Sequence, residues 1–155
     1  DYDNDGYLDL IMSGIAYGST GFDGTRVTHL YHNNLSGNPN TVPVAPTGLN
    51  ATVNGQSVVL SWQKATDSKT PQNGLSYNLF VGTIPNAFNI QSPMSQVPSG
   101  LRRIVAMGSQ NENTSWTIDN LQLGTYYWGV QTIDTGFAGS AFATGSFTVT
   151  QGGGG

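Results

Sequence analysis

The sequence predicts an all-β protein in two parts: a two-stranded ribbon that carries a calcium-binding loop, and a larger β-sandwich. Three observations support this prediction. Four aspartates are concentrated within residues 1–9. Further along, short segments of alternating hydrophobic and polar residues are separated by clusters of Gly, Pro and Asn, a pattern typical of strands and turns. Charged residues make up only 9% of the chain, far below the usual share, which suits an extracellular all-β protein whose solubility depends on hydroxyl and amide groups.

The first element is the acidic loop DYDNDGYLD at residues 1–9. Ca²⁺ binds about six to eight oxygen atoms, and carboxylates on alternate residues of a tight loop point toward a common centre. The D-x-D-x-D-G spacing favours a calcium site over a solvated acidic turn. It differs from an EF-hand because the final Glu is missing and a strand follows in place of a helix. The predicted ligands are the side chains of Asp1, Asp3, Asp5 and Asp9 and the main-chain carbonyl of Tyr7.

Two strands of the ribbon are expected next. Residues 7–13 have the alternation of a strand, and residues 25–33 place Val27, His29 and Tyr31 on one face. Residues 14–24, rich in Gly, Ser and Thr, are expected to connect the two strands as a loop. The calcium-binding ribbon is therefore expected to cover residues 1–38. A two-stranded ribbon is marginally stable by itself and has open edges, so it needs a packing partner.

The sandwich is expected over residues 47–150, after a proline-rich and semi-rigid linker at 39–46 and before a glycine-rich tail at 151–155. We expect seven strands, and within the long segment 83–111 a mobile arm followed by an additional strand at 101–107. The residues predicted to face the core are Leu49, Ala51, Val53, Val58, Leu60, Trp62, Tyr77, Leu79, Val81, Trp116, Ile118, Tyr126, Trp128, Val130, Phe147 and Val149.

The first part of the chain resembles a known family. The run DYDNDGYLDLIMSG, followed by HLYHNN, is similar to a single FG-GAP or VCBS-type repeat over roughly residues 1–36. The resemblance implies that Asp1, Asp3, Asp5 and Asp9 bind Ca²⁺. Several such repeats form a β-propeller, whereas one repeat is present here. The ribbon is therefore expected to pack on the following domain, on another chain or on further repeats.

The second part, about residues 43–150, resembles a fibronectin type III domain, an immunoglobulin-like β-sandwich. The resemblance rests on APTGL at 45–49, VLSW at 59–62 and LQLGTYYW at 121–128. It implies that Trp62 is the buried tryptophan of strand B and that Tyr126 forms the tyrosine corner of this fold.

The other candidate residues favour a structural role over catalysis. His29 and His32 are expected on opposite faces of one strand, so they do not share a metal. The inward phase of Trp62, Trp116 and Trp128 favours the core over stacking on sugars. The pair Arg102-Arg103 is expected on a solvated strand.

No catalytic constellation is recognisable. The chain has no cysteine, hence no disulfide or thiolate chemistry. It has no evident pair of nucleophile and base, so we expect no enzymatic activity. The absence of a strong basic cluster argues against nucleic acid as a partner, and no hydrophobic run is long enough to span a membrane.

Three functions are compatible with these features. The chain could be an extracellular calcium-binding structural module that self-associates head to tail through strand pairing into a filament or surface fibre. It could also be a spacer or adhesion module of a larger secreted bacterial protein or enzyme. The third possibility is a carbohydrate-binding module that recognises surface glycans. It would be favoured if aromatic side chains such as those of Tyr17, Phe22 and Phe88 are coplanar and exposed. We favour the first, with calcium and copies of the same chain as partners.

Overall fold

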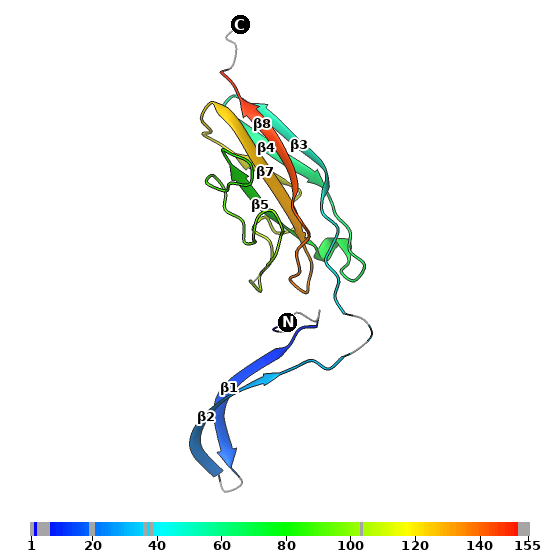
Figure 1. The fold of residues 1–155 in the computed structure, drawn as a ribbon, viewed down its shortest axis with the longest axis vertical. Coiled ribbons are helices and arrows are strands. Elements are labelled where there is room, and N and C mark those ends of the chain that lie inside the picture. Colours follow the sequence, from blue (N-terminus) through cyan, green and yellow to red (C-terminus); the bar gives the residue numbers. More distant parts are fainter. Residues whose placement is uncertain are drawn as a thin grey trace. The chain divides into compact units, whose positions relative to one another are not determined.

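A computed structural model of the chain describes residue 2 and residues 7–18, 21–35, 37, 39–102 and 104–151, with the backbone alone at 17–18 and 21–23. The predicted all-β class is confirmed: the regular elements in this part of the chain are eight strands and a short 3₁₀ helix, Gln72–Gly74. The chain forms two compact units, Asp1–Asn40 and Thr41–Gly155, each visible in Figure 1. Within the ranges just given, no helix is long and apolar enough to cross a membrane.

The first unit is an antiparallel ribbon of β1 (Leu10–Gly18) and β2 (Gly21–Tyr31). Leu10 lies opposite Tyr31, and the register shifts once, between Ile15 and Tyr17. The prediction of a loop over 14–24 is therefore wrong, because both strands continue into that stretch. Antiparallel pairing satisfies main-chain hydrogen bonds whatever the side chains are, so a Gly-, Ser- and Thr-rich sequence can extend a hairpin.

The second unit contains two antiparallel sheets of three strands. One has the order β3-β4-β6 and the other β5-β7-β8. This pairing matches strands A-B-E and C-F-G of an immunoglobulin-like sandwich without strand D. Membership of the fibronectin type III family stays a prediction. The bounds are Thr47–Asn54 for β3, Ser57–Gln63 for β4, Ser76–Gly82 for β5, Ser115–Ile118 for β6, Gly124–Ile133 for β7 and Ala143–Val149 for β8.

The number of strands differs from the prediction. This unit has six strands in the described residues, not seven, and the described residues of 101–107 form no strand. The side chain of Arg102 bonds the carbonyls of Ile104 and Ala106 and so holds this stretch in an irregular conformation, as shown below.

The hairpin between β3 and β4 has a two-residue loop. Asn54 lies opposite Ser57, and Gly55 has a φ of 58°. A glycine with positive φ at the first central position is the signature of a type II′ turn, whose twist matches that of the flanking strands. Gly55 therefore allows the chain to reverse direction within two residues.

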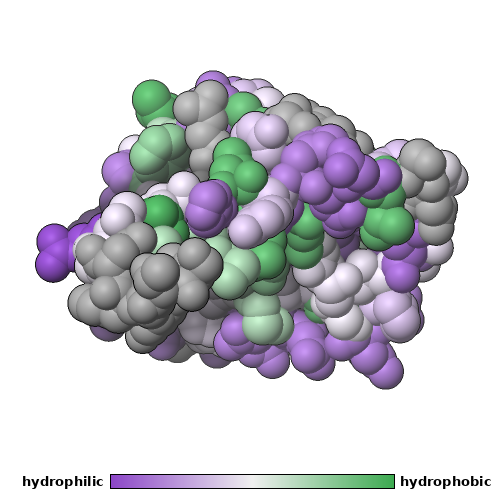
Figure 2. Space-filling model, turned by 90° about the horizontal axis from the view of Figure 1, so that it is seen from below, coloured by the Kyte–Doolittle hydropathy of each residue, from purple (hydrophilic) through white to green (hydrophobic). Residues whose placement is uncertain are grey.

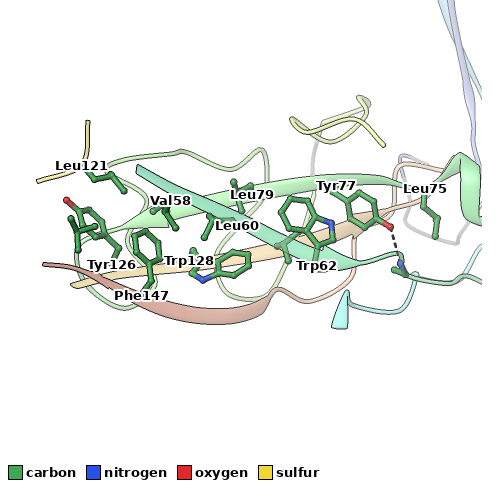
Figure 3. Close-up of a cluster of buried hydrophobic side chains, with 14 residues drawn as sticks. Val58, Leu60, Trp62, Leu75, Tyr77, Leu79, Leu121, Tyr126, Trp128 and Phe147 are labelled. Carbon is green, nitrogen blue, oxygen red and sulfur yellow. Dashed lines mark hydrogen bonds between the residues drawn. The ribbon is translucent and has the colours of Figure 1, made fainter. Parts of the chain in front are cut away.

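The core lies between the two sheets (Figure 3). Trp62 of β4 and Trp128 of β7 are both buried, with ring centroids 6.4 Å apart, and Tyr77 of β5 lies edge-on to Trp62 at 5.7 Å. Buried residues of β4, β5, β7 and β8 form this cluster, and Leu49, Ala51 and Val53 of β3 pack against it. The predicted inward phase of these strands is confirmed.

Trp116 is the exception. It lies opposite Leu60, a fully buried residue, so it does face inward, yet 37% of it is exposed. The reason is its position on β6, an outer strand of the sheet with no further strand beside it among the described residues. The prediction that Trp116 is a core residue is wrong.

Tyr126 makes the hydrogen bond expected of a tyrosine corner. Its hydroxyl donates to the main-chain carbonyl of Gln122, four residues upstream, at 2.9 Å, while its ring stacks on Phe147 with centroids 5.2 Å apart. This arrangement fixes the entry of the chain into β7.

A long segment covers the outer face and edge of β5. We call the described residues of 83–111 the platform. Gln110 N donates to Tyr77 O at 2.9 Å, and Tyr77 N donates to Asn111 O at 2.8 Å. A Cβ added at Gly108 would overlap the carbonyl oxygen of Tyr77, so glycine permits this close approach. The expectation of a mobile arm is wrong for the described residues, because hydrogen bonds tie them to the sheet.

Replacing Tyr77 by phenylalanine is expected to destabilise the sandwich. The buried hydroxyl accepts a hydrogen bond from Ala65 N at 3.0 Å, and an Ala65 NH left without an acceptor should cost about 1–3 kcal/mol. Burial also raises the pKa of Tyr77. Above the ordinary tyrosine pKa of about 10, the unfolded chain therefore ionises first, and stability falls as pH rises toward the folded pKa.

Denaturant unfolding of wild type and Tyr77→Phe at neutral and alkaline pH checks both effects. The variant should be less stable at neutral pH and should lose less stability as the pH rises. An equal alkaline loss in the two proteins would show that Tyr77 does not carry the pH dependence.

Candidate calcium site

The described part of the predicted loop centres on Asp9, just before β1. One carboxylate oxygen, Oδ1, accepts a hydrogen bond from Asn33 N at 2.8 Å, and the other, Oδ2, accepts one from Tyr2 N at 2.9 Å. Asn33 also donates through Nδ2 to the carbonyl oxygen of Leu8 at 3.1 Å. Asp9 therefore joins the residues that precede β1 to those that follow β2.

These contacts keep the carboxyl of Asp9 ionised. The hydrogen bond from the main-chain NH of Asn33 lowers the pKa of Asp9, slight burial opposes it, and the NH of Tyr2 lowers the pKa further. An ionised carboxylate has about four acceptor positions, so it can accept several interactions at once. An ionised carboxylate is also the kind of oxygen ligand that Ca²⁺ prefers.

The donor set suits a hard cation. The predicted ligands are oxygen atoms alone, which is the preference of Ca²⁺, and Asp9 is already oriented by main-chain donors. Asp9 and Tyr7 lie in the described part of the chain, whereas Asp1, Asp3 and Asp5 lie outside the described residues. Among the residues that are described, no three His, Cys, Asp or Glu side chains are grouped closely enough to hold a metal.

The two histidines have other contacts. Nδ1 of His32 lies 2.8 Å from Oδ1 of Asn34, within hydrogen-bonding distance, and its ring lies edge-on to Tyr2 at 6.2 Å. His29 packs against Tyr31 at 5.9 Å on β2. β2 ends at Tyr31, so His32 lies beyond the strand.

A buried polar cluster in the sandwich was missed from sequence. Asn78 of β5 and Gln131 of β7 are fully buried on the outer face of the sheet. Asn78 Nδ2 donates to Ser95 Oγ at 3.0 Å and to Gln131 Oε1 at 3.1 Å, and Asn78 Oδ1 accepts from Met94 N at 3.1 Å. The signal that could have revealed it is an amide in the middle of an otherwise apolar strand, as in YNLFV at 77–81.

Arg102 also belongs to this cluster, so its prediction as a solvated residue is wrong. Its Nε donates to the carbonyl of Phe137 at 3.2 Å, and its Nη2 donates to the carbonyls of Ile104 and Ala106. Burial lowers the pKa of Arg102, and the nearby charge of Asp134 opposes that shift. A guanidinium remains charged at neutral pH. Arg102 thus holds the irregular chain around it by hydrogen bonds to carbonyls. Arg103 lies outside the described residues.

No protein-family model and no curated protein matches this sequence. Among solved structures, the chain is similar to the spore cortex lytic enzyme SleM of Clostridium perfringens, at 16% sequence identity and a TM-score of 0.45. The similarity covers 89% of this chain and 38% of that enzyme, so the chain spans well under half of its length. This likeness is too distant to indicate a family or a function.

Proposed function

We propose that this chain is an extracellular calcium-binding structural module that self-associates head to tail. The observation that carries the proposal is the surface of the ribbon. Residues paired across two antiparallel strands share a face, and neighbours along a strand alternate between faces. By this rule, one face carries Leu10, Met12 and Tyr31, and the other carries Ile11, Ile15 and Leu30. All six are exposed, Ile11 to 69%.

A ribbon with large exposed hydrophobic residues on both faces is unusual for a solvated hairpin. A half-solvated antiparallel sheet has one polar face, and large exposed apolar patches mark interaction sites. Neither outer edge of the ribbon pairs with another strand in the described residues. Figure 2 shows, on one face of the molecule, hydrophobic residues at the surface among hydrophilic ones. The ribbon therefore has the hydrophobic faces and the open edges that a second chain can cover.

The contact proposed is heterologous: the ribbon of one copy docks on the sandwich of the next. Such contacts produce open filaments when the rotation between copies does not close a ring. Calcium at the predicted loop offsets two of the four negative charges of the aspartate ligands, and Asp9 joins this loop to the residue that follows the end of β2 by two positions, Asn33. The sparse charge and the absence of cysteine fit an extracellular module in which calcium supplies the rigidity that disulfides supply elsewhere.

Calcium binding is the first test. Isothermal titration should show Ca²⁺ binding to the wild-type chain, and Asp3→Ala or Asp5→Ala should weaken it by roughly tenfold or more, because the remaining ligands do not complete a shell of about six to eight oxygens. The matched control is Asp119→Ala, which removes a carboxylate in the sandwich, away from the loop in sequence. Equal affinity in all four proteins would refute the predicted site.

Self-association is the second test. In millimolar calcium, sedimentation velocity should show species larger than a monomer that grow with protein concentration, and a chelator should reduce them. Ile11→Asp should also reduce them, because an exposed charge replaces part of the hydrophobic face. A chain that stays monomeric at high concentration in calcium would contradict the proposal.

One observation favours a second candidate, a carbohydrate-binding module. An open hollow of about 230 Å³ lies on the sheet β5-β7-β8 and combines apolar and polar side chains, although it is smaller than the usual small-ligand pocket. Phe88, one of the predicted aromatic candidates, is exposed, while the side chains of Tyr17 and Phe22 lie outside the described residues. Binding of a soluble polysaccharide that is lost in Tyr127→Ala would favour this candidate. Residues lining the hollow include Phe80, Asn86, Tyr127, Thr144 and Ser146.

A further inference from the structure

We propose that the platform of the sandwich is the surface on which the ribbon of a second copy docks. The inference rests on the proposed self-association and names the receiving surface. Three properties carry it: a hollow with four apolar lining residues, a conformation held by hydrogen bonds to the sheet, and a segment whose net charge in the sequence is opposite to that of residues 1–40.

The hollow has a volume of about 450 Å³ and opens at the surface. Four of its lining residues are apolar, and Ser95 and Gln96 complete it. Next to it, Val105 is 77% exposed and Met107 is also exposed. A concave apolar surface of this kind can receive a row of aliphatic side chains such as those of the ribbon. The apolar lining residues are Pro93, Met94, Leu101 and Ile104.

The platform is held in place from beneath. Ser95 Oγ donates to Gln131 Oε1 at 2.6 Å, and Gln96 N donates to the carbonyl of Leu101 at 2.9 Å, which closes the turn between these two lining residues. Arg102 holds the next turn of the chain through carbonyls, including that of Ile104. Hydrophobic side chains on a backbone fixed in this way lose little conformational freedom when a partner binds, which favours binding.

The sequence segments that contain the two surfaces carry net charges of opposite sign. Residues 83–111 contain two arginines and no acidic residue, whereas residues 1–40 contain five aspartates and one arginine. Complementary charge speeds the encounter and selects the register of a hydrophobic contact. The acidic ribbon of another copy is therefore a better match for the platform than a second platform would be. This difference favours head-to-tail over symmetric pairing.

Two full-length variants test the docking. Ile11→Asp disables the ribbon and keeps the platform, and Ile104→Asp disables the platform and keeps the ribbon. In millimolar calcium each should sediment as a monomer, while an equimolar mixture should form a one-to-one dimer, because one good ribbon and one good platform remain. Leu123→Asp, which places the same charge at a comparably exposed site outside the platform, should assemble like wild type. Val105→Asp is a second platform variant, and near-ultraviolet circular dichroism reports whether each variant is folded.

The outcomes separate the two proposals. If the folded platform variants assemble like wild type while Ile11→Asp does not, the ribbon docks elsewhere and the platform inference is overturned. Monomers that do not combine in the mixture also overturn it. If wild type itself is monomeric, the proposed function fails together with this inference.

Discussion

Replacing Trp128 by alanine is expected to lower the free energy of unfolding of the sandwich by about 3–5 kcal/mol. Only 1% of Trp128 is exposed, and its indole packs between the sheets beside Trp62 (Figure 3). Alanine would leave a cavity that the neighbouring side chains fill only in part. A β-sandwich of this size has a total stability of about 5–15 kcal/mol, so the loss is a large fraction of it.

Trp116→Ala is the matched control for this experiment. The same indole is removed, but from an outer strand where it is partly exposed, so the expected loss is smaller, about 1–2 kcal/mol. Urea unfolding monitored by circular dichroism measures both variants. Equal losses at the two positions would show that burial between the sheets does not distinguish them.

Replacing Asn78 by alanine is expected to cost about 2–4 kcal/mol, because buried hydrogen-bonding groups left without partners cost about 1–3 kcal/mol each. The side chain is fully buried. Its loss removes the acceptor of Met94 N and one donor to Gln131 Oε1. The effect should concentrate in the platform, because Asn78 contacts it through Met94 and Ser95.

Hydrogen exchange locates that effect. In Asn78→Ala the amides of the platform should exchange faster than those of β4 and β7. Asn50→Ala, at an exposed position of β3 where the amide donates to Thr52 Oγ1 at 3.1 Å, should change stability by about 0.5 kcal/mol or less. Faster exchange spread evenly over the sandwich would show that Asn78 supports the whole core and not the platform alone.

The strands of the sandwich were predictable because their inward residues follow a strict period of two. Trp62, Tyr77 and Trp128 were all placed correctly by this pattern, since the side of a strand that a residue faces depends only on its position along the strand. The turn at Gly55 was predictable for a local reason as well, because its positive φ favours glycine.

Trp116 shows where this reasoning stops. Period-two alternation assigns a face but not a place within the sheet, and exposure depends on whether another strand lies alongside. β6 is an outer strand, and that position follows from long-range pairing with β4. No local pattern in SWTI at 115–118 carries that information.

The platform was not predictable for a similar reason. The many turn-forming residues within 83–111 indicated a mobile arm. Residues 101–107, at the end of this arm, were expected to form a separate strand. Their conformation depends on Asn78 and Gln131, which come from strands distant in sequence and meet only in the folded sheet. Arg102, which was predicted as a solvated residue, is likewise positioned by carbonyl groups that the fold brings around it.

For the calcium site, the residue types and spacing alone indicated an oxygen-rich loop, because ligand chemistry is a local property of D-x-D-x-D-G. The link from Asp9 to Asn33 was not visible in the sequence, since it joins a residue before β1 to a residue after β2. Local composition and period thus sufficed for the all-β class, the inward faces and the candidate ligands. The exposure of Trp116, the anchoring of the platform and the two apolar faces of the ribbon depend on which strands pair, and pairing is a contact between distant parts of the chain.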